Sequence, residues 1–427
     1  MEVYAQSSPY AGGVIFKNSG TKENPIRVRG IRAGTARPII SGGDTTVQFD
    51  GSHYVFEGFD IKSGNIRNVF HHADDITIAD TVVHDCVGHG ILGADDDSGS
   101  LTLDHVEVYA CGSGTTKHPI YIATDENTHP GSVFRMQYSY VHDGKGGNNV
   151  KSRAERNELY YNWIEGGYYR EIELIGPENG VAEGLKREDS DVVGNVFVKT
   201  TTQPETTNVA RVGGDGDADT SGRYRFVNNT FILRANSTAA VIQVFDKVES
   251  IELHNNVFYK VGGGAVNVVR TTEAKWVAGE IIAGSNNWLP AGTTLPSTVT
   301  GSITGTDPGF VNIGNYDVRV TASSILIGKG LIPTVSPAGH VFPSPLVAPR
   351  SSPPMRTVDP AGTAVGRASL PRIALGAFEN GAQSTAPSPG GAVVPPTGGG
   401  ASSAGDPAAP GGPGGGDPSG AGGEGCH

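Results

Sequence analysis

The sequence predicts an all-β fold, a parallel β-helix in which the chain winds as a solenoid, and three observations support this. A pattern of the form apolar–x–apolar–x–x–Asn–x–Phe recurs, most clearly at Val192–Phe197, Tyr224–Ile232 and Ile251–Tyr259. Within each copy, Val, Ile and Phe alternate with polar residues as in strands, and Gly, Asn and Asp fill the segments between copies. Self-similarity at an interval of about 20 to 50 residues is typical of solenoids, whose units bury their apolar faces against their neighbours.

The second asparagine of the pattern aligns down the whole repeat. The aligned residues are Thr81, Val106, Ser139, Asn162, Asn195, Asn229, Asn256 and Asn287. Strands of a parallel β-helix pair with their equivalents one coil away, about 4.8 Å along the axis. Asparagines stacked at an inward bend can therefore hydrogen-bond to one another and to the turn backbone. We predict that these asparagines build the fold and do no chemistry.

The chain divides into four predicted parts. Residues 1–50 form partial N-terminal coils, because the residues after Met1 already resemble the inside of a coil; they contain no signal peptide, and the native N-terminus is expected to be missing. Residues 51–330 form the β-helix, and residues 331–383 close it as a segment packed on the helix. Residues 384–427 lack aromatic residues, Lys and Arg, and are predicted to be a disordered Gly/Pro-rich tail.

Composition narrows the classes of function. The net charge is −12 and the isoelectric point about 5.4, and no Lys/Arg cluster marks a nucleic-acid site. No apolar stretch reaches the length of a membrane span, and the 62 glycines fit a turn-dense β fold with a flexible tail. We therefore expect a monomeric protein with neither a nucleic-acid partner nor a membrane span.

Two cysteines align on successive coils. Val83–Cys86 superposes on Val108–Cys111, so the two thiols are expected to lie within reach of each other. A disulfide and a reduced pair in a column of small residues both fit this alignment, and the sequence does not decide between them.

Segments near both ends of the repeat carry a resemblance to a known fold family. The opening segments are Gly20–Gly30, Arg37–Gly43 and His53–Ile61, and the closing segments are Asp307–Val311, Tyr316–Val320 and Gly376–Glu379. They resemble the first and last coils of the secreted right-handed parallel β-helix proteins of the pectin-lyase fold. The resemblance covers residues 10–380 and implies a single-stranded right-handed helix and a secreted or cell-surface location. This architecture serves lyases, hydrolases, epimerases and adhesins, so it assigns no reaction.

A local motif resembles an enzyme family. Asn148–Ala154 reads N-N-V-K-S-R-A, which is similar to the region around the catalytic lysine in the polysaccharide lyase family of chondroitinase B and related alginate lyases. The resemblance implies that Lys151 removes the proton alpha to a uronate carboxylate. Two features differ from that family. Gly144–Gly147 stands where the family keeps acidic calcium ligands, and Glu173–Gly176 stands where it keeps an arginine motif.

The strands around this motif alternate inward apolar residues with outward polar ones. The predicted outward column consists of Tyr121, Lys151, Glu173 and Arg211. Further predicted members of this face are Asn149 and Arg153, which flank Lys151, and His118, Asn148 and Arg170, which begin their strands. Uncharacterised β-helix proteins show a similar set, in which the acid corresponds to Glu171 or Glu173. This face is the candidate site.

The set fits β-elimination of an acidic polysaccharide, which needs a base, an acid and a neutralised carboxylate. Lys151 is the predicted base, provided that neighbouring positive charge lowers its pKa, and Tyr121 or His118 is the predicted acid. Arg153 and Arg211 would clamp the substrate carboxylate in place of calcium. The predicted catalytic residues are Lys151, Arg153, Tyr121 and His118, and the predicted substrate-binding residues are Glu173, Arg211, Asn149 and Arg170.

Two acidic clusters offer other chemistry. Asp95–Asp97 could supply the paired carboxylates of a glycoside hydrolase, although three acids in a Gly-rich loop are more often a solvated turn. Asp215, Asp217 and Asp219 occupy alternate positions of a loop that resembles a calcium site, but the Gly and the Glu of that loop pattern are absent. Calcium is the one cofactor that the sequence suggests.

The sequence thus predicts a secreted or cell-surface polysaccharide lyase that cleaves an acidic, uronate-containing polysaccharide. A non-catalytic carbohydrate-binding or adhesive β-helix protein is one alternative, in which Lys151 and Glu173 form a structural salt bridge across coils. A glycoside hydrolase on the same fold, which uses Asp95–Asp97, is another. A lyase needs a lysine that titrates low, whereas a binding module needs only exposed cationic and aromatic groups.

Overall fold

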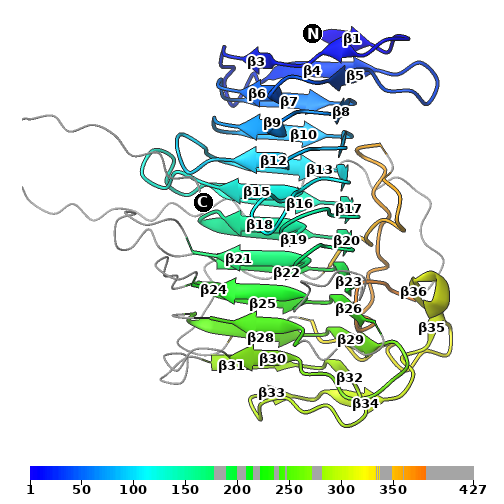
Figure 1. Ribbon diagram of the computed structural model, residues 1–427. Coiled ribbons are helices and arrows are strands. Elements are labelled where there is room, and N and C mark those ends of the chain that lie inside the picture. Colours follow the sequence, from blue (N-terminus) through cyan, green and yellow to red (C-terminus); the bar gives the residue numbers. More distant parts are fainter. Residues whose placement is uncertain are drawn as a thin grey trace, which may run out of the picture. The chain divides into compact units, whose positions relative to one another are not determined.

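The computed structural model winds the chain into coils whose strands stack as three parallel sheets (Figure 1). It describes residues 1–176, 189–199, 208–214, 222–234, 240–245, 248–271, 281–332, 334, 336, 349–358 and 360–380. Each sheet takes one strand from each coil that crosses it, in chain order. This architecture is a right-handed parallel β-helix, which confirms the predicted fold class.

Strand bounds follow the three sheets. Sheet A consists of β1 (Glu2–Tyr4), β4 (Ile26–Ile31), β7 (Tyr54–Glu57), β10 (Ile76–Ala79), β13 (Leu101–Asp104), β16 (Val133–Gln137), β19 (Arg156–Tyr160), β22 (Asp189–Val193), β25 (Arg223–Val227), β28 (Ser250–His254), β31 (Ile281–Ser285) and β33 (Val299–Thr300). Sheet B consists of β2 (Tyr10–Ala11), β5 (Ile39–Ser41), β8 (Asp60–Lys62), β11 (Val82–His84), β14 (Glu107–Tyr109), β17 (Tyr140–His142), β20 (Trp163–Glu165), β23 (Val196–Lys199), β26 (Thr230–Leu233), β29 (Val257–Lys260), β32 (Trp288–Pro290) and β34 (Ile303–Gly305). Sheet C consists of β3 (Val14–Phe16), β6 (Thr45–Phe49), β9 (Arg67–His71), β12 (His89–Gly93), β15 (Ile120–Ala123), β18 (Val150–Arg153), β21 (Ile172–Ile175), β24 (Ala210–Gly213), β27 (Ile242–Val244) and β30 (Val269–Thr271).

A left-handed residue separates sheet A from sheet B in successive coils and explains the asparagine pattern. These residues, with φ between 43° and 70°, are Asp80, His105, Tyr138, Tyr161, Gly194, Asn228, Asn255 and Asn286. Asn, Asp and Gly tolerate this conformation best, which accounts for the first asparagine of each Asn-Asn pair. The second asparagine follows the bend and is fully buried, as at Asn229 and Asn256.

The predicted asparagine stack is present. Each side-chain amide from Asn162 to Asn256 donates to the Oδ1 of the next asparagine at 3.0 Å. The same amides donate to carbonyl oxygens of sheet A at 2.7 or 2.8 Å. Each of these polar side chains is buried and has its hydrogen bonds met by the fold. The stack therefore has the structural role predicted for it.

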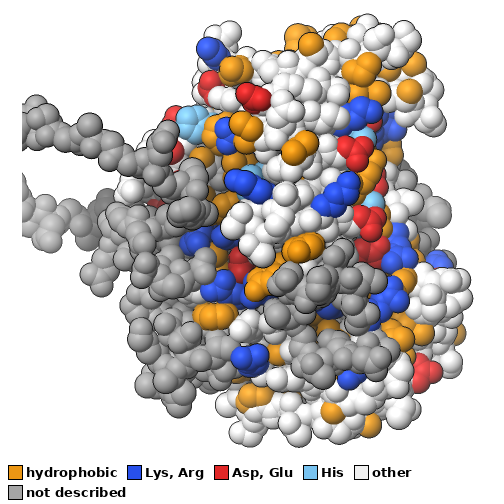
Figure 2. All heavy atoms as spheres, viewed as in Figure 1, with side chains coloured by type: hydrophobic (Ala, Val, Ile, Leu, Met, Phe, Trp, Pro, Cys, Tyr) orange, Lys and Arg blue, Asp and Glu red, His pale blue; other side chains and the backbone are white. Residues whose placement is uncertain are grey.

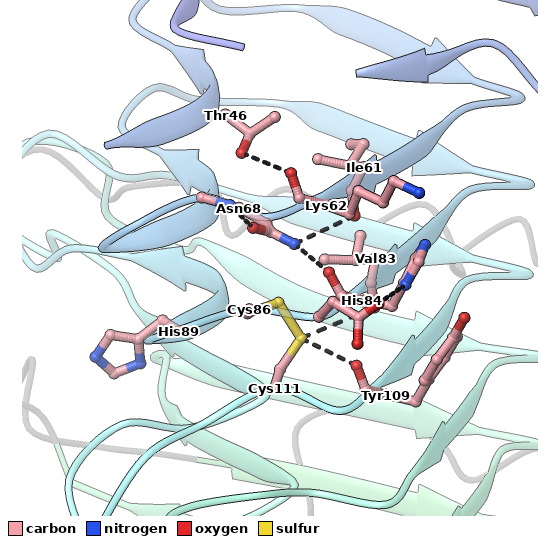
Figure 3. Close-up of a disulfide and its surroundings, with 12 residues drawn as sticks. Thr46, Ile61, Lys62, Asn68, Val83, His84, Cys86, His89, Tyr109 and Cys111 are labelled. Atoms are coloured by element: carbon pink, nitrogen blue, oxygen red, sulfur yellow. Dashed lines mark hydrogen bonds and ion pairs between the residues drawn. A yellow bond between two sulfur atoms is a disulfide. The ribbon is translucent and has the colours of Figure 1, made fainter. Parts of the chain in front are cut away.

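Cys86 and Cys111 form a disulfide, which decides the question that the alignment left open. Both cysteines lie in turns between sheets B and C, and the Gly112 N–H donates to the Gly88 carbonyl oxygen at 2.9 Å. His89 follows the first of these turns, and its ring points away from the disulfide (Figure 3). The linked turns thus set where two neighbouring strands of sheet C begin.

Residues beyond the last coil return along sheet B. They include β35 (Phe310–Asn312), the 3-10 helix η2 (Ile313–Asn315) and β36 (Asp317–Val320), with β35 and β36 antiparallel. Within residues 349–380, Arg356 pairs with Glu165 at 2.6 Å. Asn228 donates to the Gly376 carbonyl oxygen at 3.2 Å. The described part of this segment therefore contacts coils that lie far from it in sequence.

All described residues belong to one compact unit, Met1–Pro389. The segment predicted to be a tail, residues 384–427, lies outside the described residues. In the part of the chain that the structure describes, no helix is long and apolar enough to cross a membrane.

Candidate functional site

Sheet C brings the predicted outward column together. Its register pairs Tyr121 in β15 with Lys151 in β18, then Lys151 with Glu173 in β21, and Glu173 with Arg211 in β24. Adjacent members are therefore one strand spacing apart, about 4.8 Å. The residues predicted to point inward are fully buried; these are Ile120, Val150, Ile172 and Ala210. The alternation that predicted the column holds throughout these four strands.

Glu173 lies at the centre of a buried ion-pair network. Its Oε1 accepts from Arg170 Nη1 at 3.2 Å and from Arg211 Nη1 at 2.9 Å. Its Oε2 accepts from the Asn148 side-chain amide at 2.8 Å. Glu173 is 3%, Arg170 6% and Arg211 9% exposed. Buried charges persist only when they are paired and hydrogen-bonded in this way. Two predicted substrate-binding residues, Arg170 and Arg211, therefore both contact a third, Glu173.

Lys151 lies beside two other predicted catalytic residues. It is half-buried, and its Nζ lies over the Tyr121 ring, 4.6 Å from the ring centroid. Arg153 donates from Nε to the Tyr121 hydroxyl at 3.2 Å and from Nη1 to the Gly176 carbonyl oxygen at 2.7 Å. Lys151, Tyr121 and Arg153 thus form one cluster, which lies one coil from Glu173.

Two imidazoles border this cluster, and sequence reasoning identified only His118. The His118 ring centroid lies 5.4 Å from that of Tyr121, and the His89 centroid lies 5.8 Å from that of His118. Burial, aided by nearby positive charge, lowers the pKa of His89 to about 4 and that of His118 well below its usual value. A sequence signal for His89 exists, because it occupies the place in H-G-I-L-G that His118 occupies in H-P-I-Y-I.

Two residues considered for the outward face lie inside the molecule. Asn149 is fully buried, and its side-chain amide donates to Glu171 Oε2 at 2.8 Å. β18 begins only at Val150, so the alternation that predicted an outward Asn149 does not extend to it. Glu171, the alternative acid, is also fully buried and pairs with Lys199 at 3.8 Å. The acid of the column is therefore Glu173.

The described residues contain no group of three or more His, Cys, Asp or Glu side chains placed to hold a metal ion. Asp215, Asp217 and Asp219, the predicted calcium ligands, lie outside the described residues. At the turn before Lys151, a β-carbon on Gly147 would lie 2.2 Å from His118 Nδ1. The imidazole fills the space that a side chain would need there, so this turn does not fit the calcium ligands of the resembled family.

Asp95–Asp97 is exposed and follows the far end of β12. Asp97 shares a hydrogen bond with the His129 ring at 3.1 Å, and its backbone N–H donates to Asp125 Oδ2 at 3.0 Å. These contacts tie two neighbouring loops together. They support a solvated turn rather than a pair of catalytic carboxylates.

Charge on the visible surface is mixed. Figure 2 shows Lys and Arg side chains scattered among acidic and hydrophobic ones over the described part of that face. Because the overall net charge is −12, any excess of positive charge on this protein has to be local.

Comparisons with known proteins identify solved structures with a similar course of the chain. No protein-family model matches the sequence, and no curated protein matches it. The chain is similar to pectate lyase Pel9A, at 11% identity over 89% of this chain and 86% of that chain, with a TM-score of 0.45. An alginate lyase from Paenibacillus sp. str. FPU-7 is 15% identical over 71% of this chain and 91% of that chain, with a TM-score of 0.40.

A further solved structure belongs to a different reaction class. The GH136 lacto-N-biosidase from Eubacterium ramulus is 13% identical over 65% of this chain and 61% of that chain, with a TM-score of 0.36. Identities this low assign no reaction to this chain. Its fold class rests on its own strand register, and its chemistry has to be argued from the site.

Proposed function

We propose that this protein cleaves an acidic, uronate-containing polysaccharide by β-elimination, with Lys151 as the base. The observation that carries the proposal is the register of sheet C, which sets Lys151 between Tyr121 and Glu173 in one column. An amine, a phenol and a group of cations on adjacent strands match the three demands of elimination. Strand pairing holds these groups at a fixed spacing, which favours reaction over random encounter.

In the proposed step, the neutral amine of Lys151 takes the C5 proton of a uronate residue. The C5–H electron pair becomes the new C4–C5 double bond as the C4–O glycosidic bond breaks, and the leaving oxygen takes a proton from Tyr121. Arg153 donates to the Tyr121 hydroxyl at 3.2 Å and so stabilises the phenolate that remains. Proton exchange with solvent then releases the Lys151 proton and reprotonates the Tyr121 phenolate, which restores both groups.

Tyr121, rather than His118, is the proposed acid. The pKa of His118 lies well below its usual value because the ring is buried near Lys151 and His89. At neutral pH the imidazole is therefore uncharged, and its remaining N–H is far too weak an acid to protonate a leaving group. His118 keeps a role as a hydrogen-bond donor.

Charge around the column favours both a neutral amine and an anionic ligand. Among the residues that the structure describes, Lys151, Arg153, Arg170 and Arg211 place four cations in or beside the column that holds the carboxylate of Glu173. Loss of the Lys151 proton relieves repulsion with three guanidinium groups. The same excess of positive charge attracts a polyanion locally.

The test is the absorbance of the unsaturated product during incubation with alginate, pectate and glycosaminoglycans. Lys151→Ala should slow product formation by about 10²- to 10⁴-fold, the usual contribution of a positioned base. Lys145→Ala removes an exposed lysine from the preceding turn and should leave the rate unchanged. Product formation that persists in Lys151→Ala contradicts the role of this lysine. Parallel reactions with calcium and with chelator test the proposed calcium site at Asp215, Asp217 and Asp219.

A non-catalytic carbohydrate-binding or adhesive protein is the second candidate. The network of Arg170, Glu173 and Arg211 favours it, because buried ion pairs of this kind can hold the sheet together without taking part in turnover. Binding of a polyuronate without any unsaturated product would select this candidate. A monomeric protein at a secreted or cell-surface location belongs to the same proposal, and size-exclusion chromatography and cell fractionation test those two points.

A further inference from the structure

We propose that His89 and His118 form an uncharged, hydrogen-bond-donating subsite for the sugar residues next to the one at Lys151. This inference rests on the proposed function and extends it. The subsite would bind hydroxyl or carboxylate oxygens, and its two members belong to the two coils that precede Lys151. At about 4.8 Å per coil, a polysaccharide lying along the solenoid axis would pass both rings.

Backbone donors fix the orientation of both rings. The His118 N–H donates to His89 Nδ1 at 3.1 Å, and the Asn148 N–H donates to His118 Nδ1 at 2.8 Å. Because each Nδ1 accepts a hydrogen bond, the proton of each neutral ring has to reside on Nε2. The two imidazoles are thus held in the same tautomer by the same kind of contact, one coil apart.

The Nε2 atoms are available to a ligand. In the part of the chain that the structure describes, no hydrogen bond to either Nε2 is found, and neither atom is among the buried polar atoms that lack a partner. The rings are largely enclosed, with His118 3% and His89 6% exposed. The surrounding residues therefore hold each ring, and its Nε2–H group, in one orientation. A buried ring with one accessible N–H is suited to a directional contact.

Burial, and after it the positive charge of neighbouring groups, lowers the pKa of both rings and keeps them uncharged. Arg67 on β9, Lys117 before β15 and Lys151 on β18 supply the positive charge that acts on His89. His118 is influenced by Lys151, by His89 and by Lys117. Tyr121 contributes the ring that packs against both imidazoles. Protonation would add a further cation to this group, so the rings stay neutral donors across the range in which histidine usually titrates.

The experiment uses the full chain labelled with ¹⁵N-histidine. Tautomer and titration are followed through the ring nitrogen signals from about pH 5 to about pH 8. Both rings should show the Nε2–H tautomer and should not titrate in this range, whereas His142, whose pKa is raised by Glu107 and Asp143 against the effect of burial, should be protonated at the acidic end and serves as the internal control. An Nδ1–H tautomer, or titration of His89 and His118 near a pH of about 6.5, overturns the inference.

Oligouronates are then added to the same sample. Perturbation of the His89 and His118 Nε2 signals supports the subsite. Binding that perturbs other signals and leaves these two unchanged overturns the subsite and spares the proposed function. Absence of binding by any oligouronate overturns both, so the two failures are distinguishable.

Matched variants test the donor role in turnover. Asparagine places its Oδ1 near the position of Nδ1, so His89→Asn and His118→Asn keep the backbone contact and remove the Nε2 donor. Each should raise KM by roughly 2- to 10-fold, the value of one hydrogen bond, with kcat changed by less than about 2-fold. His142→Asn on sheet B should leave KM unchanged. An unchanged KM in both donor variants, with circular dichroism intact, contradicts the inference.

Discussion

At the scale of single residues, we expect Glu173 to contribute more than Lys151 to the stability of the candidate site. Two guanidinium groups and one amide converge on its carboxylate, and all of these groups are buried. Removing one partner of a buried ion pair leaves an uncompensated charge, which costs about 3 to 5 kcal/mol. Loss of the Glu173 carboxylate would leave both Arg170 and Arg211 without this ion pair.

We therefore expect Glu173→Ala to lower the free energy of unfolding by about 3 to 5 kcal/mol. Lys151→Ala, at a half-buried position, should lower it by less than about 1 kcal/mol. Urea unfolding followed by circular dichroism measures both. Equal losses in the two variants would show that the Glu173 network does not hold the site together.

Two histidines on sheet B behave differently from those at the site. Burial alone would lower the pKa of His84, but hydrogen bonds and charge from Asp60 and Asp85 outweigh it and raise the pKa. The pKa of His142 is raised in the same manner, because hydrogen bonds and charge from Glu107 and Asp143 outweigh the effect of burial. Their rings stack on either face of Tyr109 at 4.8 and 5.0 Å.

These pKa shifts predict a pH-dependent contribution to stability. A histidine whose pKa is raised on folding stabilises the protein fully below its unfolded-state pKa of about 6.5. That contribution is lost as the pH rises through the folded-state value. The midpoint of thermal unfolding should therefore differ more between wild type and the His84→Gln/His142→Gln double variant at a pH of about 5.5 than at about 8.5. A difference that grows with pH contradicts this assignment.

At the scale of elements, the asparagine stack joins one coil to the next. Asn195 donates to the Leu159 carbonyl oxygen and to Asn229, and its own Oδ1 accepts from the backbone and side chain of Asn162. Ser302 ends the stack with one acceptor contact at 3.3 Å and is only partly buried. The cost of a substitution should therefore depend on its place in the stack.

We expect Asn195→Ala to lower the free energy of unfolding by at least about 3 kcal/mol, because it leaves several buried polar groups unpaired at about 1 to 3 kcal/mol each. Ser302→Ala should cost about 1 kcal/mol or less. Chemical unfolding of the two variants beside wild type makes the comparison. Similar losses at both positions would mean that the stack stabilises only as a sum of isolated bonds.

Strand alternation predicted the column on sheet C but not the turns that flank it. Tyr121, Lys151 and Glu173 lie within strands, where side chains face alternate sides, and the structure places them as predicted. Asn149 lies just before a strand, where no such period applies, and it turns inward to Glu171. Sequence reasoning about the site was therefore reliable only inside paired strands.

At the scale of the whole molecule, residues 349–380 cover part of sheet B. Two hydrophobic clusters form there, one around Trp163 with Phe378 and one around Trp288 with Leu375. Gly376 adopts φ +82°, and a β-carbon on it would lie 2.6 Å from a side-chain oxygen of sheet B. This close approach lets the segment reach the strands.

A chain that ends at residue 349 should therefore expose both tryptophans. We expect a red shift of tryptophan fluorescence and a lower midpoint of thermal unfolding, because fully buried aromatic side chains each contribute about 2 to 3 kcal/mol by burial. Arg29→Ala, which removes an exposed ion pair to Glu57 on sheet A, should leave the emission wavelength unchanged. An unshifted spectrum in the shortened chain would show that the segment does not shield these residues.

The sequence by itself determined the solenoid, the stacked asparagines and the outward column around Lys151. These features repeat with a local period, and a period of two in each strand, copied coil after coil, is visible in one dimension. The two cysteines were aligned by the same repeat, but only the structure shows that they are bonded.

Tertiary structure decided what depends on contacts between segments distant in the chain. The buried pair of Glu171 and Lys199, the His89 ring beside His118 and the packing of residues 349–380 on sheet B arise where turns and returning segments meet. Burial raises the pKa of Glu171 and lowers that of Lys199, and no periodic pattern encodes such an environment. Turns follow no fixed period, so the placement of their side chains is set by packing across coils.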